Sequence, residues 1–258
     1  MKIYFMLAFI QRDPYHPLIS EVIAKLSARS FEVSTGVAES VAISPEGLKV
    51  EADLYILKSH SKLWFNVAAV LDAKGARILN PYPACVNTSN KIRAAACLAA
   101  AEVPLPRSWV TGDLIHIREL TKAMPLLIKP NLGGNGLGIR LVREISELVT
   151  TQVEDGMFVQ ELVTPVEDEL KLYVIGERVF GIRKHGDDYR ENINVEPMLT
   201  EIAIRCGKAL GLSIYGVDVV LNANGPIVVD VNYFPSFRGV PAIADTLADH
   251  IASVALQS

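Results

Sequence analysis

The sequence has few cysteines, few aromatic residues and no long hydrophobic run. Its 258 residues include only three cysteines, Cys85, Cys97 and Cys206, and their spacing matches no metal-binding motif. An odd number of thiols argues against a disulfide framework, so a reducing, cytoplasmic location is expected. We expect all three thiols to pack as small apolar side chains.

The chain also lacks an excess of positive charge. Its formal net charge is -4, so no global field predicts a nucleic-acid partner, and a polyanionic ligand would need a local basic cluster. The apolar opening, residues 1–10, is too short to span a membrane and has no small-residue cleavage site. We therefore expect neither a membrane anchor nor a signal peptide, but a buried parallel strand.

Residues 1–86 alternate between strand and helix patterns, which is typical of an α/β lobe with a parallel sheet. Apolar runs predict strands at 3–10, 53–57 and 76–79, and helical spacing predicts helices at 17–28 and 64–73. Pro81 and Pro83 mark the border of this lobe.

Two α+β lobes are expected to follow, at 87–159 and 160–258. The first should begin with a helix and contain a glycine-rich flap between two strands. The second should be mostly antiparallel, because Gly176–Arg178 and Asn222–Pro226 are hairpin signals. The predicted strands are 109–110, 126–129, 139–142, 157–160, 170–175, 179–184, 214–221 and 227–231. The predicted helices are 88–102, 114–121, 145–150, 200–210 and 242–256.

Three oxygen-bearing side chains interrupt the second of these hairpins. Asp218 breaks an apolar run, and Asp230 and Asn232 are two residues apart on the next strand, so they share a face. Two carboxylates at about 4 Å repel each other by roughly 4 kcal/mol at an effective dielectric near 20. Magnesium prefers such hard oxygen ligands and would remove the repulsion, whereas pairing with Lys or Arg is the alternative.

A lysine and a glycine loop form a second candidate site. Lys129 ends an apolar strand, and the loop after it contains Gly134 and Gly136, whose backbone can approach phosphate oxygens closely. No Gly-Lys-Ser/Thr follows, and a strand rather than a helix comes next, so neither a Walker loop nor a dinucleotide fingerprint is present. The alternative is a lysine that reaches past the strand to solvent.

The segment after the central lobe is a candidate adenine site. Gln160, Glu161, Leu162 and Val163 leave a strand at a lobe edge, where backbone groups could read the edge of a base. A plain interdomain linker is the alternative interpretation.

Basic residues gather in two places in this acidic protein. Arg183, Lys184 and Arg190 lie close to Asn192 in the last lobe, and Lys58, His60 and Lys62 follow the second predicted strand of the first lobe. Ligands of open α/β sheets collect at the carboxyl ends of strands, which favours a binding role for the first-lobe group. Solvated surface charge is the ordinary alternative for both groups.

Taken in order, these features resemble the ATP-grasp superfamily. The matching elements are Lys91 at the start of a helix, Lys129-Pro130 with the glycine flap, Gln160-Glu161, Glu169-Leu170-Lys171 and the Asp218, Asp230 and Asn232 hairpin. The resemblance implies ATP and Mg²⁺ between two α+β lobes, with two metal ions expected and Mn²⁺ as a substitute. It implies that Asp218, Asp230 and Asn232 hold the metal. It also implies that the following residues bind the nucleotide: Lys91, Lys129, Gly134, Gly136, Gln160, Glu161, Leu162, Val163, Glu169 and Lys171.

Two branches of the superfamily are similar to this chain. The glycine flap, and the segment with Arg183, Arg190 and Asn192, resemble RimK-type carboxylate–amine ligases. The ending Asp230–Pro235 is more similar to inositol polyphosphate kinases.

Each branch implies its own reaction. In a ligase, the substrate carboxylate would take the γ-phosphate and an amine would displace it, with Arg183, Arg190 and Asn192 as catalytic residues. In a kinase, Lys58, His60, Lys62 and Arg238 would bind an anionic polyol. A non-catalytic nucleotide-binding protein is the third class. The expected partner is a small-molecule or peptide substrate rather than nucleic acid or membrane, and a homo-oligomer is left open.

Overall fold

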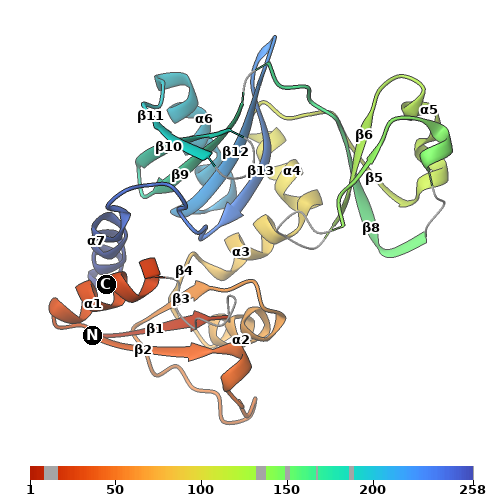
Figure 1. Cartoon of the computed structure of the whole chain (residues 1–258). Helices are drawn as coiled ribbons and strands as arrows, with labels where there is room; N and C mark the ends of the chain where they lie inside the picture. The colour runs from red at the N-terminus through yellow and green to blue at the C-terminus, as the bar shows by residue number, and fades with distance from the viewer. Residues whose placement is uncertain (9–16, 132–137, 149–151, 167, 186–188, 258) are drawn as a thin grey trace.

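Three sheets organise the chain in the computed structural model (Figure 1), which describes residues 1–8, 17–131, 138–148, 152–166, 168–185 and 189–257. One sheet is parallel and two are antiparallel. Within the described parts of the chain, no helix is both long and apolar enough to cross a membrane.

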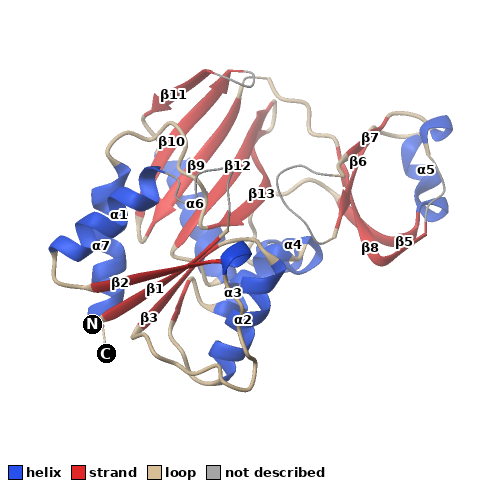
Figure 2. Ribbon diagram, turned by 60° about the horizontal axis from the view of Figure 1, so that its bottom comes forward, coloured by secondary structure: helices blue, strands red, loops and turns tan. Residues whose placement is uncertain are grey.

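The N-terminal sheet is parallel and has the strand order β2-β1-β3-β4. Its strands are β1 (Lys2–Leu7), β2 (Glu32–Val37), β3 (Leu54–Lys58) and β4 (Ile78–Leu79). Helices α1 (Pro17–Ala28) and α2 (Lys62–Ala73) cover its two faces (Figure 2). The sequence pattern missed β2, whose alternating polar residues mark an edge strand. The predicted first strand ends at Leu7, and its residues 9–10 lie outside the described ranges.

The central lobe projects to one side and has a small core of its own. Helices α3 (Tyr82–Ser89) and α4 (Lys91–Ala100) precede it; the helix predicted at 88–102 corresponds to α4, and α3 was not predicted. Its antiparallel sheet has the order β5-β8-β6-β7, and its core includes Leu126, Ile128 and Val159. Its strands and short helices are β5 (Ser108–Asp113), η2 (Leu114–Ile117), α5 (Arg118–Thr121), β6 (Leu126–Pro130), β7 (Arg140–Val142), η3 (Ile145–Glu147) and β8 (Gln152–Glu161).

The C-terminal sheet is fully antiparallel, with the order β11-β10-β9-β12-β13. Both predicted hairpins are present, as β9–β10 and β12–β13. The sequence pattern missed β11, a highly polar strand. The elements are β9 (Glu169–Ile175), β10 (Arg178–His185), β11 (Tyr189–Ile193), α6 (Pro197–Leu210), β12 (Ile214–Asn222), β13 (Gly225–Tyr233) and α7 (Ile243–Leu256).

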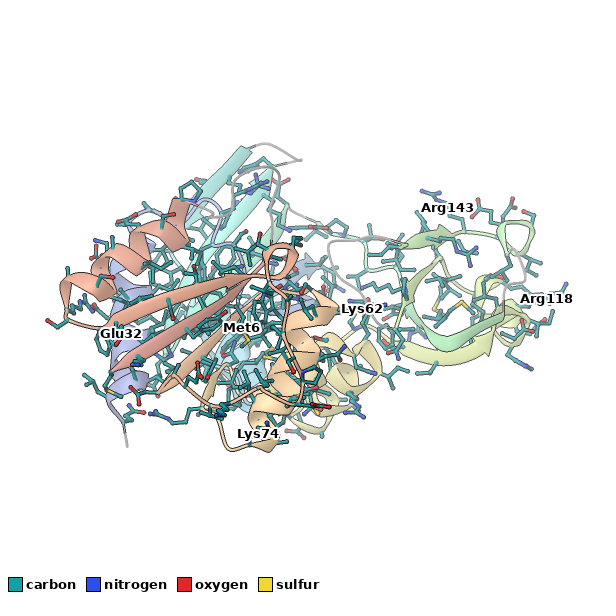
Figure 3. All side chains as sticks on the ribbon, turned by 90° about the horizontal axis from the view of Figure 1, so that it is seen from below. Met6, Glu32, Lys62, Lys74, Arg118 and Arg143 are labelled. Carbon is teal, nitrogen blue, oxygen red and sulfur yellow. The ribbon has the colours of Figure 1, made fainter. Side chains whose placement is uncertain are left out.

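The N-terminal and C-terminal sheets share one continuous hydrophobic core, whereas the central lobe keeps a separate one. Seen from below, the fully buried Met6 lies inside the shared core, and Arg118 and Arg143 lie on the projecting lobe (Figure 3). Helix α7 packs on α1, with ion pairs Lys25–Asp245 at 2.7 Å and Arg29–Asp249 at 2.5 Å. The last helix therefore completes the first lobe.

Asn80 ties the two larger sheets together. Its side chain is fully buried, its Nδ2 donates to the Ile214 carbonyl at 2.7 Å, and its Oδ1 accepts from the Ser213 and Ile214 amides, each at 2.9 Å. One amide side chain therefore satisfies the backbone where β12 begins.

We expect Asn80→Ala to lower the free energy of unfolding by about 3–5 kcal/mol, because it leaves buried backbone groups unpaired at about 1–3 kcal/mol each. Urea unfolding followed by circular dichroism measures the change. Asn66→Ala, on the exposed face of α2, is the matched control and should shift stability by no more than about 0.5 kcal/mol. Equal effects of the two changes would contradict this role for Asn80.

Candidate functional site

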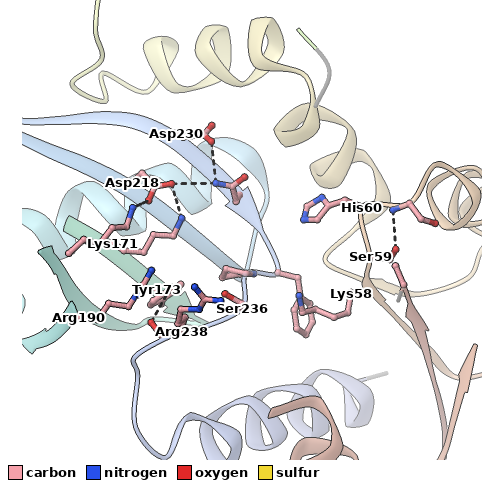
Figure 4. A pocket seen from close by; sticks show the side chains of 16 residues that line it. Lys58, Ser59, His60, Lys171, Tyr173, Arg190, Asp218, Asp230, Ser236 and Arg238 are labelled. Atoms are coloured by element: carbon pink, nitrogen blue, oxygen red, sulfur yellow. Dashed lines mark hydrogen bonds and ion pairs between the residues drawn. The ribbon is translucent and has the colours of Figure 1, made fainter. Parts of the chain in front are cut away.

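A cavity of about 620 Å³ lies where the parallel sheet meets the C-terminal sheet (Figure 4). Its walls come from the β3–α2 loop, from strands β9 to β13 and from the segment that follows β13. The volume is within the usual range for small-molecule sites, about 300–1,000 Å³. It lies at the carboxyl end of β3, as expected for an open α/β sheet.

The three predicted oxygen-bearing side chains meet in this cavity. Asp218 on β12 lies opposite Asp230 on β13, and a β-bulge follows Asp218. Nδ2 of Asn232 lies 3.2 Å from Oδ2 of Asp230 and 3.5 Å from Oδ2 of Asp218. The hairpin therefore brings two carboxylates and an amide together, as the sequence pattern indicates.

Lysines from three elements neutralise the two carboxylates. Lys171 on β9 lies 2.7 Å from Asp218, and Lys184 on β10 lies 3.4 Å from it. Lys91, at the first residue of α4, lies 3.3 Å from Asp230. Both sequence interpretations are thus present together: the carboxylates converge, and they also pair with lysines.

The donor set fits a hard divalent cation. The carboxylates of Asp218 and Asp230 both line the large cavity. The oxygen and nitrogen of an amide side chain are assigned from the hydrogen-bond network, so rotating the Asn232 amide by half a turn would present its oxygen in place of its nitrogen. No group of three His, Cys, Asp or Glu side chains gathers within the described ranges. The fit therefore depends on the amide as the third protein ligand.

Lys129 lies inside the protein, at the junction of the central lobe and β13. Only 7% of the residue is exposed, and its Nζ donates to Oε1 of Gln160 at 2.6 Å and to the Val229 carbonyl at 3.3 Å. Burial lowers the pKa of Lys129, while the charge of Asp230 opposes this shift. The lysine therefore does not extend to solvent, which was the alternative sequence interpretation. Gly134 and Gly136 of the predicted flap lie outside the described residues.

A second, smaller cavity adjoins the first. It measures about 40 Å³, and Lys91, Lys129, Phe158, Gln160 and Asp230 are among the residues that line it. That space holds about one water molecule, whose share of liquid volume is about 30 Å³. A nucleotide base would need the central lobe to move away from β13. Asp230 lines both cavities, so one carboxylate is shared between them.

The predicted adenine segment is less open than the sequence indicates. The Glu161 carboxylate binds Arg107, with 2.6 Å to Nε and 2.9 Å to the backbone nitrogen. The Glu161 amide donates to the Arg107 carbonyl, and the Leu162 amide donates to the Pro125 carbonyl. These two amides were expected at a free strand edge, but neighbouring strands already use them. Gln160 and the backbone near Val163 are left to meet a base.

Several predicted catalytic residues lie away from the cavity. Arg183 does not line it, because Lys184 does and neighbouring residues on a strand face opposite sides. Asn192 donates to the Gly239 carbonyl at 3.0 Å and does not line it either. Arg190 lies in the cavity wall. Glu169 is exposed, and its carboxylate lies 3.4 Å from Lys184.

The first-lobe basic cluster divides in the same way. Lys58, His60 and Arg238 line the cavity, whereas Lys62 is exposed on the first turn of α2 and does not. Lys62 is thus not brought together with the other three, because Ser61 caps the helix and the next residue turns outward. Ser59 and Tyr233, absent from the predicted set, join the two sheets through a 2.9 Å hydrogen bond from the Tyr233 hydroxyl to the Ser59 carbonyl.

The cavity shifts the protonation of the groups that it desolvates. Burial lowers the pKa of Lys58 to about 8, and its Nζ lies 5.4 Å from the centroid of the Phe234 ring. Desolvation, followed by the charge of Lys58, lowers the pKa of His60 to about 4, although the residue as a whole is exposed. Burial raises the pKa of Tyr173 to about 12. At neutral pH, His60 and Tyr173 are therefore uncharged and Lys58 is mostly cationic.

Relatives among curated proteins share most of the chain. A probable alpha-L-glutamate ligase of Xanthomonas campestris pv. campestris (strain 8004) is 27% identical over 207 residues, which cover 70% of this chain and 71% of that protein. A probable alpha-L-glutamate ligase of Stenotrophomonas maltophilia (strain K279a) is 28% identical over 204 residues, covering 69% of this chain and 70% of the other.

Solved structures show the same fold at lower identity. A RimK domain ATP-grasp protein from Sphaerobacter thermophilus DSM 20745 superposes with a TM-score of 0.82 at 20% identity, covering 100% of both chains. The ATP-grasp ligase PsnB, complexed with precursor peptide PsnA2 and AMPPNP, gives 0.71 at 20% identity, over 99% of this chain and 98% of that one. D-alanine–D-alanine ligase from Bacillus anthracis complexed with ATP gives 0.73 at 17% identity, over 99% and 97%.

These superpositions show an ATP-grasp fold built from one parallel and two antiparallel sheets. The family model of the RimK-like ATP-grasp domain matches residues 88–254, which is more than half of the chain. The chain therefore belongs to the RimK-like ATP-grasp family.

Proposed function

We propose that this protein is an ATP-dependent, magnesium-dependent ligase that joins a carboxylate to an amine through an acylphosphate. The observation that carries the proposal is the position of Asp230, which lines both the small cavity beside Lys91 and Lys129 and the large cavity. A triphosphate bound by the two lysines would end at this carboxylate, and a substrate in the large cavity would meet it from the other side.

The small cavity is the proposed nucleotide site. Lys91 and Lys129 would bind phosphate oxygens, and the Lys129 bond to Gln160 would break as the central lobe opens. Gln160 and the backbone through Val163 would hold adenine, while the exposed Glu169 would hold the ribose. Glu161 takes no direct part through its carboxylate, because Arg107 holds it.

Asp218, Asp230 and Asn232 would hold Mg²⁺. When bound, the ion supplies charge neutralisation and Lewis acidity at the phosphates. Lys171 and Lys184 neutralise Asp218 in this structure, and they would be released to meet phosphate or acyl oxygens. Two ions, Mn²⁺ as a substitute, a homo-oligomer and a cytoplasmic location stay predictions.

The proposed reaction has two balanced steps. An oxygen of the substrate carboxylate bonds to the γ-phosphorus, the bond to the β–γ bridging oxygen breaks, and ADP leaves. The amine nitrogen then attacks the acyl carbon and loses a proton, and the C–O bond to phosphate breaks. Lys184 and Arg190 face the cavity and can stabilise the anionic charge that develops. Arg190 is one of the three catalytic residues that the ligase resemblance implies, and Lys184 would act in place of Arg183 and Asn192.

Two substrate classes follow from the relatives. The curated relatives are named as glutamate ligases, so L-glutamate is the first amine to test. PsnB was solved with a precursor peptide, which keeps peptides in the panel of acids. The kinase alternative uses the same cavity residues. It differs from the ligase in that the γ-phosphate stays on the product instead of being released as inorganic phosphate.

Turnover with Mg-ATP should require both an acid and an amine. We expect ADP and inorganic phosphate in equal amounts, since the phosphate leaves the acyl group when the amide forms. Phosphorus NMR and ADP release over pools of acids, peptides and amines measure this. Phosphate held stably on the product would favour the kinase, and Mg²⁺-dependent ATP binding without turnover over the panel would favour a binding protein.

Asp230→Asn should lower kcat by at least about 100-fold and raise the Mg²⁺ concentration needed for half-maximal rate, because it removes a charge shared by both cavities. A magnesium titration of steady-state rates measures both effects. Asp249→Asn is the matched control, because Asp249 forms its ion pair with Arg29 on the surface, far from the cavity. Unchanged magnesium dependence in Asp230→Asn would contradict the metal assignment.

A further inference from the structure

The end of the large cavity away from the paired carboxylates is strongly basic. Its described lining has five basic side chains, Lys58, Lys171, Lys184, Arg190 and Arg238, against two acidic ones, Asp218 and Asp230. Lys171 and Lys184 are bound to Asp218, and Asp230 is bound to Lys91, which lies outside this cavity. We call Lys58 and Arg238, at the end away from these pairs, the basic end.

Lys58 is the central group of the basic end. It forms no ion pair with a carboxylate of the described residues, and its ammonium lies over the face of the Phe234 ring at 5.4 Å from the centroid. A cation held in a desolvating site without a counter-ion raises the free energy of the protein. Placing an anion beside it would recover that free energy.

Arg190 packs against the backbone next to Arg238. Gly239 follows Arg238, and a Cβ built at Gly239 would lie 3.3 Å from Cβ and Cδ of Arg190, so the aliphatic stem of Arg190 rests against this backbone. The Arg238 carbonyl accepts the Tyr173 hydroxyl at 3.4 Å, and the Gly239 carbonyl accepts Asn192 at 3.0 Å. The cavity wall therefore fixes the backbone that carries Arg238.

A further feature favours an anion at this end. Helix α2 begins at the cavity, with Ser61 accepting the Trp64 amide, so its partly positive N-terminus adds to the charge of Lys58. The neighbouring His60 ring packs against Tyr233 in a tilted arrangement, with centroids 4.4 Å apart.

We propose that the basic end binds a second anionic group of the substrate acid, so that the acid carries two anionic groups. The reacting carboxylate would lie at Asp218, Asp230 and Asn232, and the second anion would lie between Lys58 and Arg238. This assignment rests on the proposed ligase function, which it deepens by naming the substrate class. It also explains why the cavity has more basic than acidic side chains, an excess that binding of the metal and the nucleotide does not require.

The test compares three acids of similar length: succinate, 3-phosphonopropionate and butyrate. Isothermal titration calorimetry on the full chain measures their binding without ATP, so the result is independent of turnover. We expect succinate or 3-phosphonopropionate to bind at least about tenfold more tightly than butyrate, because a charge-assisted pair contributes that much. The stronger of the two identifies the second group as carboxylate or phosphate. Equal binding of all three, or no binding of any, overturns the proposal.

Lys58→Met and Lys62→Met form a matched pair of variants. Each variant removes one lysine from the short segment between the end of β3 and the start of α2, but only Lys58 lines the cavity. Lys58→Met should reduce binding of the dianion about tenfold, to the level of butyrate, and leave butyrate unchanged, whereas Lys62→Met should change neither. Equal losses in the two variants would overturn the assignment. If the protein binds the dianion in a Lys58-dependent way but releases no ADP, the ligase function is disproved and the anion site is not.

The melting temperature of Lys58→Met gives an independent readout. Replacing an unpaired, desolvated ammonium by a methyl thioether of similar length should raise the melting temperature in buffer without dianions, by roughly 2–4 °C for a domain of this size. Addition of succinate should then stabilise the natural protein and not the variant. A lower melting temperature for Lys58→Met would show that Lys58 already has a stabilising partner, and would overturn the proposal.

Discussion

The site depends on the mutual repulsion of two carboxylates that the β12–β13 hairpin holds face to face. Asp218 and Asp230 are opposite each other in the strand register, so the hairpin keeps the two side chains close together. Cationic charge must therefore be supplied around them. Lys91, Lys171 and Lys184 supply it from a helix and two strands, and a divalent ion with a triphosphate would supply it during turnover.

The arrangement of the lobes fits this requirement. The N-terminal and C-terminal sheets behave as one body, because they share a core and are joined through Asn80 and through Tyr233 with Ser59. The central lobe has a separate core and meets the hairpin through the Lys129 ammonium and its bonds to Gln160 and Val229. The large cavity therefore lies between two sheets that share a core, and the proposed nucleotide cavity lies at a junction between separately packed parts.

Local sequence patterns predict the elements that have strong periodicity or clear turns. The helix at 17–28 and both C-terminal hairpins follow from such patterns, and the spacing of Asp230 and Asn232 is by itself enough to place them on one face of a strand. Strands β2 and β11 escape this reasoning because the polar residues of these edge strands do not show the apolar run used to find strands.

The differences between the predicted site and the observed arrangement come mainly from pairings between distant residues. Nothing near Glu161 in the sequence shows that Arg107 occupies its carboxylate, and nothing near Lys62 shows that the cavity ends at Ser61. Arg183 was assigned to the site on resemblance, although the alternation of side chains along β10 sends it to the face opposite Lys184. The sequence indicates that alternate residues of a strand face opposite sides of the sheet. It shows which side each residue faces only once one residue of that strand has been placed.

The return of α7 to the first lobe has a consequence for how the chain is made. The apolar face of α1, with Ile19, Val22 and Leu26, packs in the shared core against which α7 lies, so α1 lacks its α7 partner until residues 243–256 have been synthesised. An emerging chain would carry an unfinished first lobe throughout translation of the central lobe and the C-terminal sheet. Contacts between such distant segments slow folding and expose apolar surface in the meantime, which makes the nascent chain a natural client for chaperones.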